Sequence, residues 1–425
     1  MKILDKTNII LFSLLPFAIL TGPFLADLFL SLIGLFFLIN NYRAIKKHTN
    51  YLIISLFICY VLFIYSSIKS EDILYSFDYS LFYFRFIVFL IATSYLLLNF
   101  KDKIILYIYP ILYFCLLILC LDSLIEFFFH RAFFGLIEVE QNSVRLKSLF
   151  ILIDEPVVGA YISKLLPLLI GFYILSNNRN FNQFCFLVHF CFLIIFLSGE
   201  RIALFYAFIT FFLFHLIFFK KRFSQICIFL LMITIFTSIT LKPKIYDRMI
   251  TQTLDQTILE ENKEISKTNL VNKYSNMIFN FYKYLPSFSN EHLSFINTSL
   301  KMHETKPILG FGPKMFDLNC ELYSQSGVCP NHPHQIYFQI LSESGFLPVL
   351  IIFSIFIFLT FNLLKSLFYF NNKSKLQNQA NIFMLLAPVM YLLPIIPTGS
   401  FFTNWNTVLF YFSFSLGIFF IKNET

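Results

Sequence analysis

The sequence predicts an all-α integral membrane protein, and three observations carry that prediction: the composition, the long apolar runs and the distribution of charge. Of the 425 residues, 58% are hydrophobic and only 13% are charged. The mean hydropathy is +0.73. A water-soluble domain does not tolerate this balance on its surface, so most of the chain is expected to lie in a lipid bilayer.

About twelve apolar runs are each long enough to cross a hydrocarbon core as a helix, which takes roughly 17 to 25 residues. The runs cover residues 8–22, 24–40, 51–67, 81–100, 104–129, 149–175, 183–200, 202–219, 224–241, 336–364, 382–397 and 406–421. Only Gly22 and Pro23 divide the first run from the second.

The charges between these runs predict the orientation of the chain. When the spans alternate from a cytoplasmic N-terminus, most loop cations fall on the cytoplasmic side, as the positive-inside rule requires. These cations are Arg43, Lys46, Lys47, Lys101, Lys103, Arg179, Lys220, Lys221, Arg222, Lys365, Lys373, Lys375 and Lys422. The net charge of +8 is mostly this topology signal. Because the basic residues form no continuous stripe, nucleic acid is not expected as a partner.

The spans divide the chain into three parts. Residues 1–241 hold the first nine spans, residues 242–335 form one large polar loop on the outer face, and residues 336–425 hold the last three spans. Within the loop, residues 270–285 and 291–303 mix apolar and polar side chains at helical spacing. This pattern predicts short helices that lie on the membrane surface or cap a cavity.

A compact turn is predicted at KPILGFGPKMF, where Pro307, Gly310, Gly312 and Pro313 favour chain reversal. The turn is either a plain connector or a phosphate cradle. A cradle needs a preceding strand and a following helix start, and the sequence supplies neither. No Walker sequence occurs, and the cytoplasmic loops are too short for a nucleotide-binding domain. ATP-driven transport by this chain alone is therefore not expected.

The eight cysteines fall into two groups. Six lie inside predicted spans and are expected to be packing residues. Cys320 and Cys329 lie in the outward loop with eight residues between them, close to His334. In an oxidising compartment they can form a disulfide, and the alternative is a pair of free thiols.

Ionisable side chains beside the apolar core are costly unless they are paired or hydrated, so each is a candidate functional residue. Arg201 lies where the span 183–200 ends and the next span begins, beside Glu200. The two side chains either pair locally or bind an anion. The second reading rests on the fixed fork of guanidinium donors, which suits phosphate oxygens.

A second charged group lies in the outward part of the sixth span. Asp154, Glu155 and Lys164 surround a Pro and a Gly that can delay or break the helix. An internal salt bridge that fixes helix register is the competing explanation. Arg145 lies just upstream, on the same membrane face.

Two further candidates belong to the large loop. Arg248 opens the loop close to the membrane, where it either pairs with Asp247 or contacts a substrate. His334 stands at the entrance of the tenth span, with Gln335 adjacent. The predicted topology brings Arg145, Glu155, Arg201, Arg248 and His334 to one membrane face.

At these residues the chain resembles the O-antigen ligase and O-antigen polymerase superfamily of bacterial membrane glycosyltransferases. The family motif is a histidine followed by Asn, Ser or Gln, nine residues, a glycine, two residues, and then Gly, Thr or Tyr. His334, Gln335 and Gly345 match it. Pro348 departs at the last position, which leaves the sub-family open.

Other segments extend the resemblance from about Arg145 to Gly345. Arg201 in SGER resembles the family's arginine after a Ser/Thr-Gly pair, and Arg248 occupies the place of a second arginine early in the large loop. The segment KPILGFGPKMF is similar to the Pro-x-x-Gly-x-Gly turn that precedes the family's histidine. The segment DEPVVGAYISKLLP is similar to an acidic-Gly-basic-Pro segment of some members.

The resemblance implies a GT-C-like fold and transfer of a glycan from an undecaprenyl-pyrophosphate carrier to an acceptor hydroxyl. The transfer inverts the anomeric carbon at the periplasmic face of the bacterial inner membrane. We expect His334, Arg201 and Arg248 to be catalytic. We expect the substrates to contact Arg145, Glu155, Lys164, Gln335 and Gly345. The arginines suit a pyrophosphate leaving group, and the imidazole suits deprotonation of a hydroxyl.

No cofactor and no metal are expected. Metal-dependent membrane glycosyltransferases usually carry an acidic pair in the first outward loop, where this chain has Thr21, Gly22 and Pro23. Asp154 and Glu155 keep a metal alternative open.

Three functions remain in competition. A ligase delivers the finished glycan to the sugar core of lipid A, whereas a polymerase joins repeat units on carrier lipids. The His-Gln-x9-Gly match favours the ligase. From another class, a flippase or transporter of lipid-linked oligosaccharides is compatible with twelve spans. Its charges would be expected in several spans of pseudo-symmetric halves, however, and not at one face.

Overall fold

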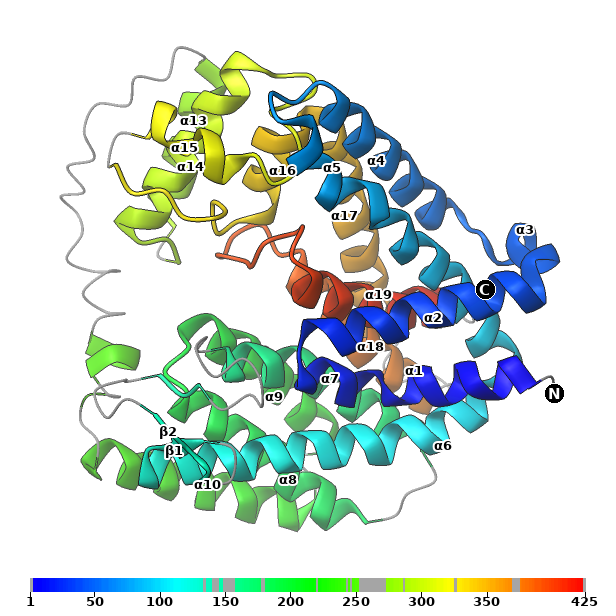
Figure 1. The fold of residues 1–425 in the computed structure, drawn as a ribbon. Coiled ribbons are helices and arrows are strands. Elements are labelled where there is room, and N and C mark those ends of the chain that lie inside the picture. The colour runs from blue at the N-terminus through cyan, green and yellow to red at the C-terminus, as the bar shows by residue number, and fades with distance from the viewer. Residues whose placement is uncertain are drawn as a thin grey trace.

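The computed structural model is built almost entirely from helices (Figure 1). The structure describes residues 3–132, 135–139, 145–147, 157–176, 180–218, 221–241, 244, 247–251, 273–285, 287–324, 327–368 and 375–422. Within these residues the two strands are a short antiparallel pair, β1 (Arg131–Ala132) and β2 (Ile137–Glu138). Predicted site residues Asp154 and Glu155 lie outside the described residues.

The long helices account for most of the chain. They are α1 (Ile3–Thr21), α2 (Pro23–Asn41), α4 (Tyr51–Ile68), α6 (Phe84–Phe129), α7 (Val158–Leu175), α8 (Phe181–Leu197), α9 (Arg201–Phe218), α10 (Arg222–Leu241), α17 (Phe346–Phe368), α18 (Lys375–Tyr391) and α19 (Asn404–Lys422). Short elements near the N-terminal half are η1 (Tyr42–Ala44), α3 (Ile45–His48), α5 (Ile73–Ser80) and η2 (Leu81–Tyr83). The large loop contains η3 (Asp247–Thr251), α13 (Lys273–Lys283), α14 (Asn290–Thr305) and α15 (Phe316–Tyr323), and α16 (Ile336–Ser344) follows it.

Within the described residues, nine helical stretches are long and apolar enough to cross a membrane, and α8 is a shorter apolar helix. The chain is therefore a multi-span membrane protein. The count of twelve spans stays a prediction. One of the nine stretches includes α6, whose non-helical residue Phe100 separates the segments predicted as spans 81–100 and 104–129.

The structure differs from the sequence prediction at the segment 336–364, which was expected as one span. Gly345 interrupts it and separates α16 from α17. The reason is local: Gly345 has a φ of 80°, a conformation that a regular helix does not contain. The predicted loop helices over residues 270–285 and 291–303 correspond to α13 and α14.

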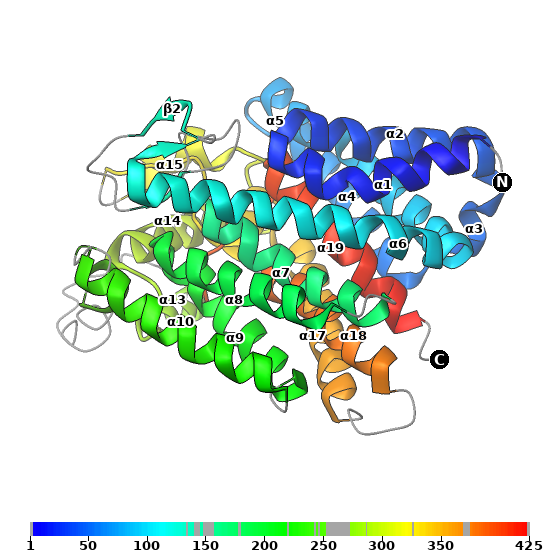
Figure 2. The same cartoon turned by 90° about the horizontal axis from the view of Figure 1, so that it is seen from below.

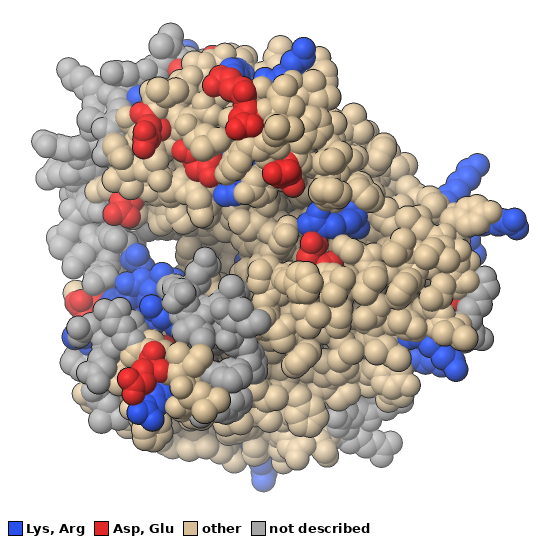
Figure 3. Space-filling view, viewed as in Figure 1, with Lys and Arg blue, Asp and Glu red and all other residues tan. Residues whose placement is uncertain are grey.

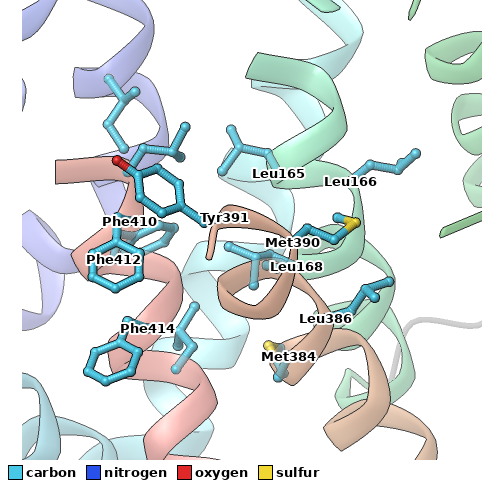
Figure 4. Close-up of a cluster of buried hydrophobic side chains, with 14 of the residues drawn as sticks. Leu165, Leu166, Leu168, Met384, Leu386, Met390, Tyr391, Phe410, Phe412 and Phe414 are labelled. Atoms are coloured by element: carbon cyan, nitrogen blue, oxygen red, sulfur yellow. The ribbon is translucent and has the colours of Figure 1, made fainter. Parts of the chain in front are cut away.

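The centre of the helical bundle is apolar (Figure 4). Side chains of α7, α18 and α19 meet there: Leu165, Leu166, Leu168, Met384, Leu386, Met390, Phe410, Phe412 and Phe414, all buried. Gly171 of α7 lets Met384 approach closely, because a Cβ at that position would lie 2.8 Å from the methionine methyl carbon. Close packing of this kind stabilises helix association in a bilayer, where lipid tails are as apolar as the helices.

The loop helices lie on one side of the bundle. In Figure 1, α13 to α16 gather beside α5, whereas both chain ends lie at the opposite side. In Figure 2, α8, α9 and α10 run side by side below α6. The space-filling view shows a hollow between the loop helices and the α8–α10 region, with Lys and Arg side chains at its lower edge (Figure 3). The candidate site residues come from the elements on both sides of this hollow.

Candidate active site

The turn between α8 and α9 carries a buried carboxylate. Glu200 precedes Arg201, the first residue of α9, and its side chain reaches back to the start of α7. Its two oxygens accept hydrogen bonds from the backbone N–H groups of Gly159 (2.6 Å) and Ala160 (3.0 Å). A helix N-terminus leaves such N–H groups unpaired and favours negative charge, so Glu200 joins the starts of α7 and α9.

Two opposing influences act on the ionisation of Glu200. Burial raises the pKa of the Glu200 carboxyl to about 7, while the charge of Arg145, the two N–H donors and the charge of Lys164 act in the other direction. A glycine is required at position 159, because a Cβ there would lie 2.4 Å from the Ser198 hydroxyl oxygen. Glu200 thus caps a helix that begins about 40 residues earlier in the chain, a role that the sequence alternatives of local pairing or anion binding did not include.

Three arginines meet at this turn. Arg248, in η3, donates a hydrogen bond from Nε to the Gly199 carbonyl oxygen at 2.9 Å. Burial lowers the pKa of the Arg248 guanidinium, and the neighbouring charges of Arg145 and Arg201 lower it further, whereas Glu200 raises it. The structure therefore brings together Arg145, Arg201 and Arg248, as the sequence predicts. We call these three residues the arginine cluster.

His334 lies two residues before α16. Its φ of 54° is rare for a residue with a side chain. The His334 carbonyl oxygen accepts a hydrogen bond from the Thr398 N–H at 2.7 Å, and the Thr398 hydroxyl accepts one from the Ile336 N–H at 2.8 Å. The backbone at His334 is therefore held by the segment between α18 and α19.

Gln335 has a clear structural task as the N-cap of α16. Its side-chain oxygen accepts hydrogen bonds from the N–H groups of Tyr337 (2.7 Å) and Phe338 (3.3 Å). Its amide nitrogen donates to the Pro394 carbonyl oxygen at 3.0 Å. The side chain is fully buried. Gln335 orients the histidine beside it, and its predicted contact with substrate stays a prediction.

Backbone packing explains why the motif has a glycine at position 345. The turn at Gly310 and Gly312 packs backbone to backbone against the end of α16, with hydrogen bonds from Phe311 N–H to Ser342 O (3.0 Å) and from Gly312 N–H to Glu343 O (2.7 Å). A Cβ at Gly345 would collide with the Ile308 carbonyl, and a Cβ at Gly310 would collide with the Glu343 backbone. Gly345 is therefore a packing residue at the C-terminal end of α16, the helix that follows His334.

A buried carboxyl completes this support. Glu343 accepts hydrogen bonds from the backbone N–H groups of Lys314 (2.9 Å) and Phe316 (3.3 Å) and from the Gln339 amide (3.2 Å). Burial raises the pKa of Glu343 to about 8, against the opposing effect of those N–H donors and the Lys314 charge. Glu343, which belongs to α16, therefore holds the turn that precedes α15 against its own helix.

Three imidazoles cluster at the site, which we call the histidine cluster. The ring centre of His334 lies 4.2 Å from that of His332 and 5.5 Å from that of His292. Phe295 lies 5.8 Å away on the same helix as His292. Burial lowers the pKa of His334, which the Glu291 charge opposes, and burial lowers the pKa of His292 to about 4. All three rings are therefore expected to be neutral at pH 7.

The arginine cluster acts electrostatically on the histidine cluster. The charges of His334 and Arg201 both contribute to the lowered pKa of His292, so the guanidinium lies within electrostatic reach of the imidazoles. A neutral imidazole is a proton acceptor, and clustered guanidinium groups stabilise an anion. The arrangement is suited to a reaction in which one group loses a proton while another gains negative charge.

Two further predicted features, Lys164 and the pair Cys320 and Cys329, belong to neither cluster. Lys164, in α7, donates to the Asn406 side-chain oxygen at 3.0 Å and stacks over the Tyr391 ring at 4.9 Å. Its charge lowers the pKa of Glu200, which links it to the arginine cluster. The structure joins Cys320 and Cys329 in a disulfide with a Cα–Cα distance of 5.7 Å. The disulfide closes the segment between α15 and His332.

Sequence reasoning missed His292 and the capping role of Glu200. His292 lies 42 positions before His334, and no local motif connects the two. One sequence signal was present: Ser289 and His292 form a capping box at the start of α14, in which the Ser289 hydroxyl lies 2.9 Å from His292 Nδ1. This contact fixes the orientation of the His292 ring at its Nδ1 edge.

The model of the O-antigen ligase family matches residues 186–354 of the chain. The match confirms the resemblance and includes Arg201, Arg248, His334 and Gly345. Members of this family are glycan-transferring enzymes that use lipid-linked glycans. No curated protein matches the chain.

Proposed function

Taking the match to the O-antigen ligase family as the premise, we propose that this protein is an O-antigen ligase-type glycosyltransferase. It transfers a glycan from undecaprenyl pyrophosphate to a sugar hydroxyl of the lipid A core. The observation that carries the proposal is the approach of a neutral histidine cluster to a cationic arginine cluster at one end of the helical bundle.

The arginine cluster is suited to the donor. The bond between the anomeric carbon and the phosphate oxygen breaks, and both bonding electrons pass to the pyrophosphate. Guanidinium groups of Arg145, Arg201 and Arg248 stabilise the charge that develops there, because a guanidinium keeps its positive charge throughout the reaction. Glu200 holds the α8–α9 turn from which Arg201 extends, and Arg248 is bound to the same turn through Gly199.

The histidine cluster is suited to the acceptor. The acceptor hydroxyl oxygen forms the new bond to the anomeric carbon from the face opposite the leaving group, which inverts that carbon. The hydroxyl proton passes to His334, the general base. A lowered pKa keeps the imidazole unprotonated at neutral pH. His332 and His292 flank this base and add no negative charge that would compete with the arginines.

The side of the membrane follows from charge. We propose that the loop helices and the site face the periplasm and that both termini are cytoplasmic, because the loops opposite the site hold most of the cations. A disulfide between Cys320 and Cys329 fits an oxidising compartment. The donor's polyprenyl chain would then approach through the bilayer.

The test is transfer by the purified protein in detergent, with an undecaprenyl-pyrophosphate-linked glycan and a lipid A core acceptor. We expect glycosylated lipid A in a chelator as well as in untreated buffer. A requirement for a divalent cation would contradict the metal-independent mechanism. Absence of product with folded protein would contradict enzymatic transfer and favour a flippase. A flippase forms no product, and it has no second compartment to transport into in detergent.

Polymerisation on carrier lipids is the second candidate, because the departure at Pro348 leaves the sub-family open. Mass spectrometry of envelope glycolipids from a deletion strain separates the two reactions. Loss of a ligase leaves carrier-linked polymer, whereas loss of a polymerase leaves single repeats on the core. The second pattern would replace the ligase assignment.

A further inference from the structure

A second cluster of potential ligands lies at the other end of α8, α9 and α10. The Sγ atoms of Cys185 and Cys227 and a ring nitrogen of His189 all lie within 4.8 Å of one another. All three residues are buried, with exposed fractions of 0%, 6% and 5% respectively. Two thiols and an imidazole are the donors that zinc prefers, and calcium or magnesium would require oxygen donors.

The histidines of this cluster have nitrogen atoms without hydrogen-bond partners. His189 Nδ1 lies 2.7 Å from the Cys185 carbonyl oxygen and 3.7 Å from the Cys185 Sγ. The carbonyl contact places a proton on Nδ1 when the ring is neutral, so a metal ion bound through Nδ1 must displace this hydrogen bond, whereas Nε2 is free to bind once the ring turns. His189 Nε2 is buried and lacks a hydrogen-bond partner within the described residues. His215 of α9 repeats the arrangement, with Nδ1 2.8 Å from the Phe211 carbonyl oxygen and Nε2 without a partner. Burying such groups unpaired costs free energy.

His215 supplies a fourth donor. Its ring is perpendicular to that of His189, with ring centres 5.2 Å apart. Donor atoms around a tetrahedral zinc lie about 3.6 Å apart, from metal distances of about 2.0 to 2.3 Å. The three donors of Cys185, His189 and Cys227 therefore need to contract by about 1 Å. Coordination by His215 as well requires its ring to turn toward them.

From these contacts we infer that Cys185, His189, His215 and Cys227 form a structural Zn²⁺ site. Binding releases one proton from each cysteine thiol, and two thiolates, one Zn²⁺ and two neutral imidazoles sum to zero charge. Neutrality matters inside a lipid-embedded bundle, where a net charge is costly. A monovalent soft cation would leave a net charge of −1, so the divalent ion is favoured.

The site is remote from the candidate active site. His215 follows Arg201 by 14 positions on α9, which corresponds to about 21 Å along a helix. Cys185 and Cys227 lie in the second turns of α8 and α10, His189 lies one turn further along α8, and His215 lies in the last turn of α9. The ion would thus join α8, α9 and α10 at one end. At the other end, Glu200 joins the α8–α9 turn to α7, and Arg248 joins η3 to the same turn.

This position gives the ion a structural consequence. Helix α10 packs against α8 and has many exposed apolar side chains on its other faces, Ile226, Phe229, Leu230, Met232, Ile233 and Phe236 among them. A metal bond through Cys227 fixes its register against α8. The chain then continues from α10 to η3, which carries Arg248.

The experiment measures metal content and does not depend on glycan transfer. Full-length protein purified without a histidine tag is stripped with a chelator, titrated with Zn²⁺, dialysed and assayed by mass spectrometry for bound zinc. We expect one zinc per chain. The double variant Cys185→Ser/Cys227→Ser should lose it, whereas the matched variant Cys59→Ser/Cys115→Ser, which removes two other buried membrane cysteines, should keep it.

Cobalt identifies the ligands. Co²⁺ in the stripped protein should give a thiolate-to-metal absorption band that is absent from the Cys185→Ser/Cys227→Ser variant and weakened in His189→Gln. The variant His292→Gln/His334→Gln tests binding at the histidine cluster and should leave the band unchanged. No retained zinc, zinc retained by the Cys185→Ser/Cys227→Ser variant, or a cobalt complex without the thiolate band would each overturn the inference. If the double-serine variant does not fold, the His189→Gln spectrum decides.

Discussion

The arginine cluster and the histidine cluster are held in place by different means. The arginine cluster depends on charge: Glu200 caps α7 and neutralises part of the guanidinium repulsion, and Arg248 binds the turn at Gly199. The histidine cluster depends on backbone geometry: His334 is fixed through Thr398, through the Gln335 cap and through the glycine turn below α16. No carboxylate within the described residues forms an ion pair with its rings.

This difference matches the tasks proposed for the two sides. A group that binds an anion can sit in a network of charges, because its own charge does not change during the reaction. A base must exchange a proton, so a strong ion pair would fix it in one protonation state. Uncharged backbone contacts position His334 without raising its pKa.

The largest expected effects come from removing one member of each cluster. Arg201→Ala and His334→Ala should each reduce transfer about 10³-fold, because each removes a group that acts in the transition state. Arg201→Ala should also raise KM for the lipid-linked donor, whereas His334→Ala should lower kcat alone. Steady-state kinetics on purified, correctly inserted protein measure both. Near-normal activity of either variant would refute the mechanism, and Arg131→Ala, on the exposed β1, serves as the unaffected control.

Gly345→Ala tests whether backbone packing positions His334. The new Cβ collides with the Ile308 carbonyl, and the φ of 80° adds strain of about 1 to 2 kcal/mol. We expect loss of most activity and a lower melting temperature. The matched variant is Gly327→Ala, because Gly327 has a φ of 69° with nothing near its Cβ position. Equal effects of the two variants would show that strain alone matters and that the contact with Ile308 does not.

The disulfide should have a smaller effect. Cys320→Ser/Cys329→Ser removes a link across a sequence separation of 9. Opening a loop of this size lowers stability by about 2.5 kcal/mol in the chain-entropy model. Limited proteolysis should cut faster between α15 and α16. The transfer rate should decline modestly, because the segment that precedes His334 is held less firmly. A variant as resistant as the parent protein would mean that other contacts, such as Lys314 Nζ to Asn331 O (3.0 Å), hold the segment alone.

The smallest effect concerns the pH profile. His334 is a base only when unprotonated, so kcat/KM should fall as the pH falls through its lowered pKa, with a midpoint below the ordinary 6.5. Glu291 raises that pKa. Glu291→Gln should therefore move the acid limb to lower pH by about 0.3 unit, as expected for one partly screened charge. A shift toward higher pH, or the same shift in Glu138→Gln, would contradict the assignment of His334 as the titrating base.

Much of this site follows from the sequence. The motif of His334 and Gly345 and the arginines at positions 145, 201 and 248 carry local signals, because charged residues beside apolar runs are rare. The sequence also indicates the multi-span helical class and the short loop helices. The break at Gly345 was missed because hydropathy continues unchanged across it.

Other parts were outside the reach of the sequence. His292 and Glu200 act through partners 40 or more positions away, and no periodic pattern encodes such pairing. The sequence predicts Cys185 and Cys227 only as packing residues. Whether their thiols meet depends on the register between α8 and α10, which the sequence does not indicate. Only the folded arrangement reveals these contacts.

The break at Gly345 also accounts for the departure at Pro348. Because α17 begins at Phe346, Pro348 occupies the first turn of a new helix. N–H groups in a first turn have no carbonyl acceptor within their own helix, so a ring that lacks an N–H removes no helical bond there. In an uninterrupted helix from 336 to 364, the same proline would break a bond and kink the chain. The family position can therefore change to proline without moving the histidine fourteen residues earlier.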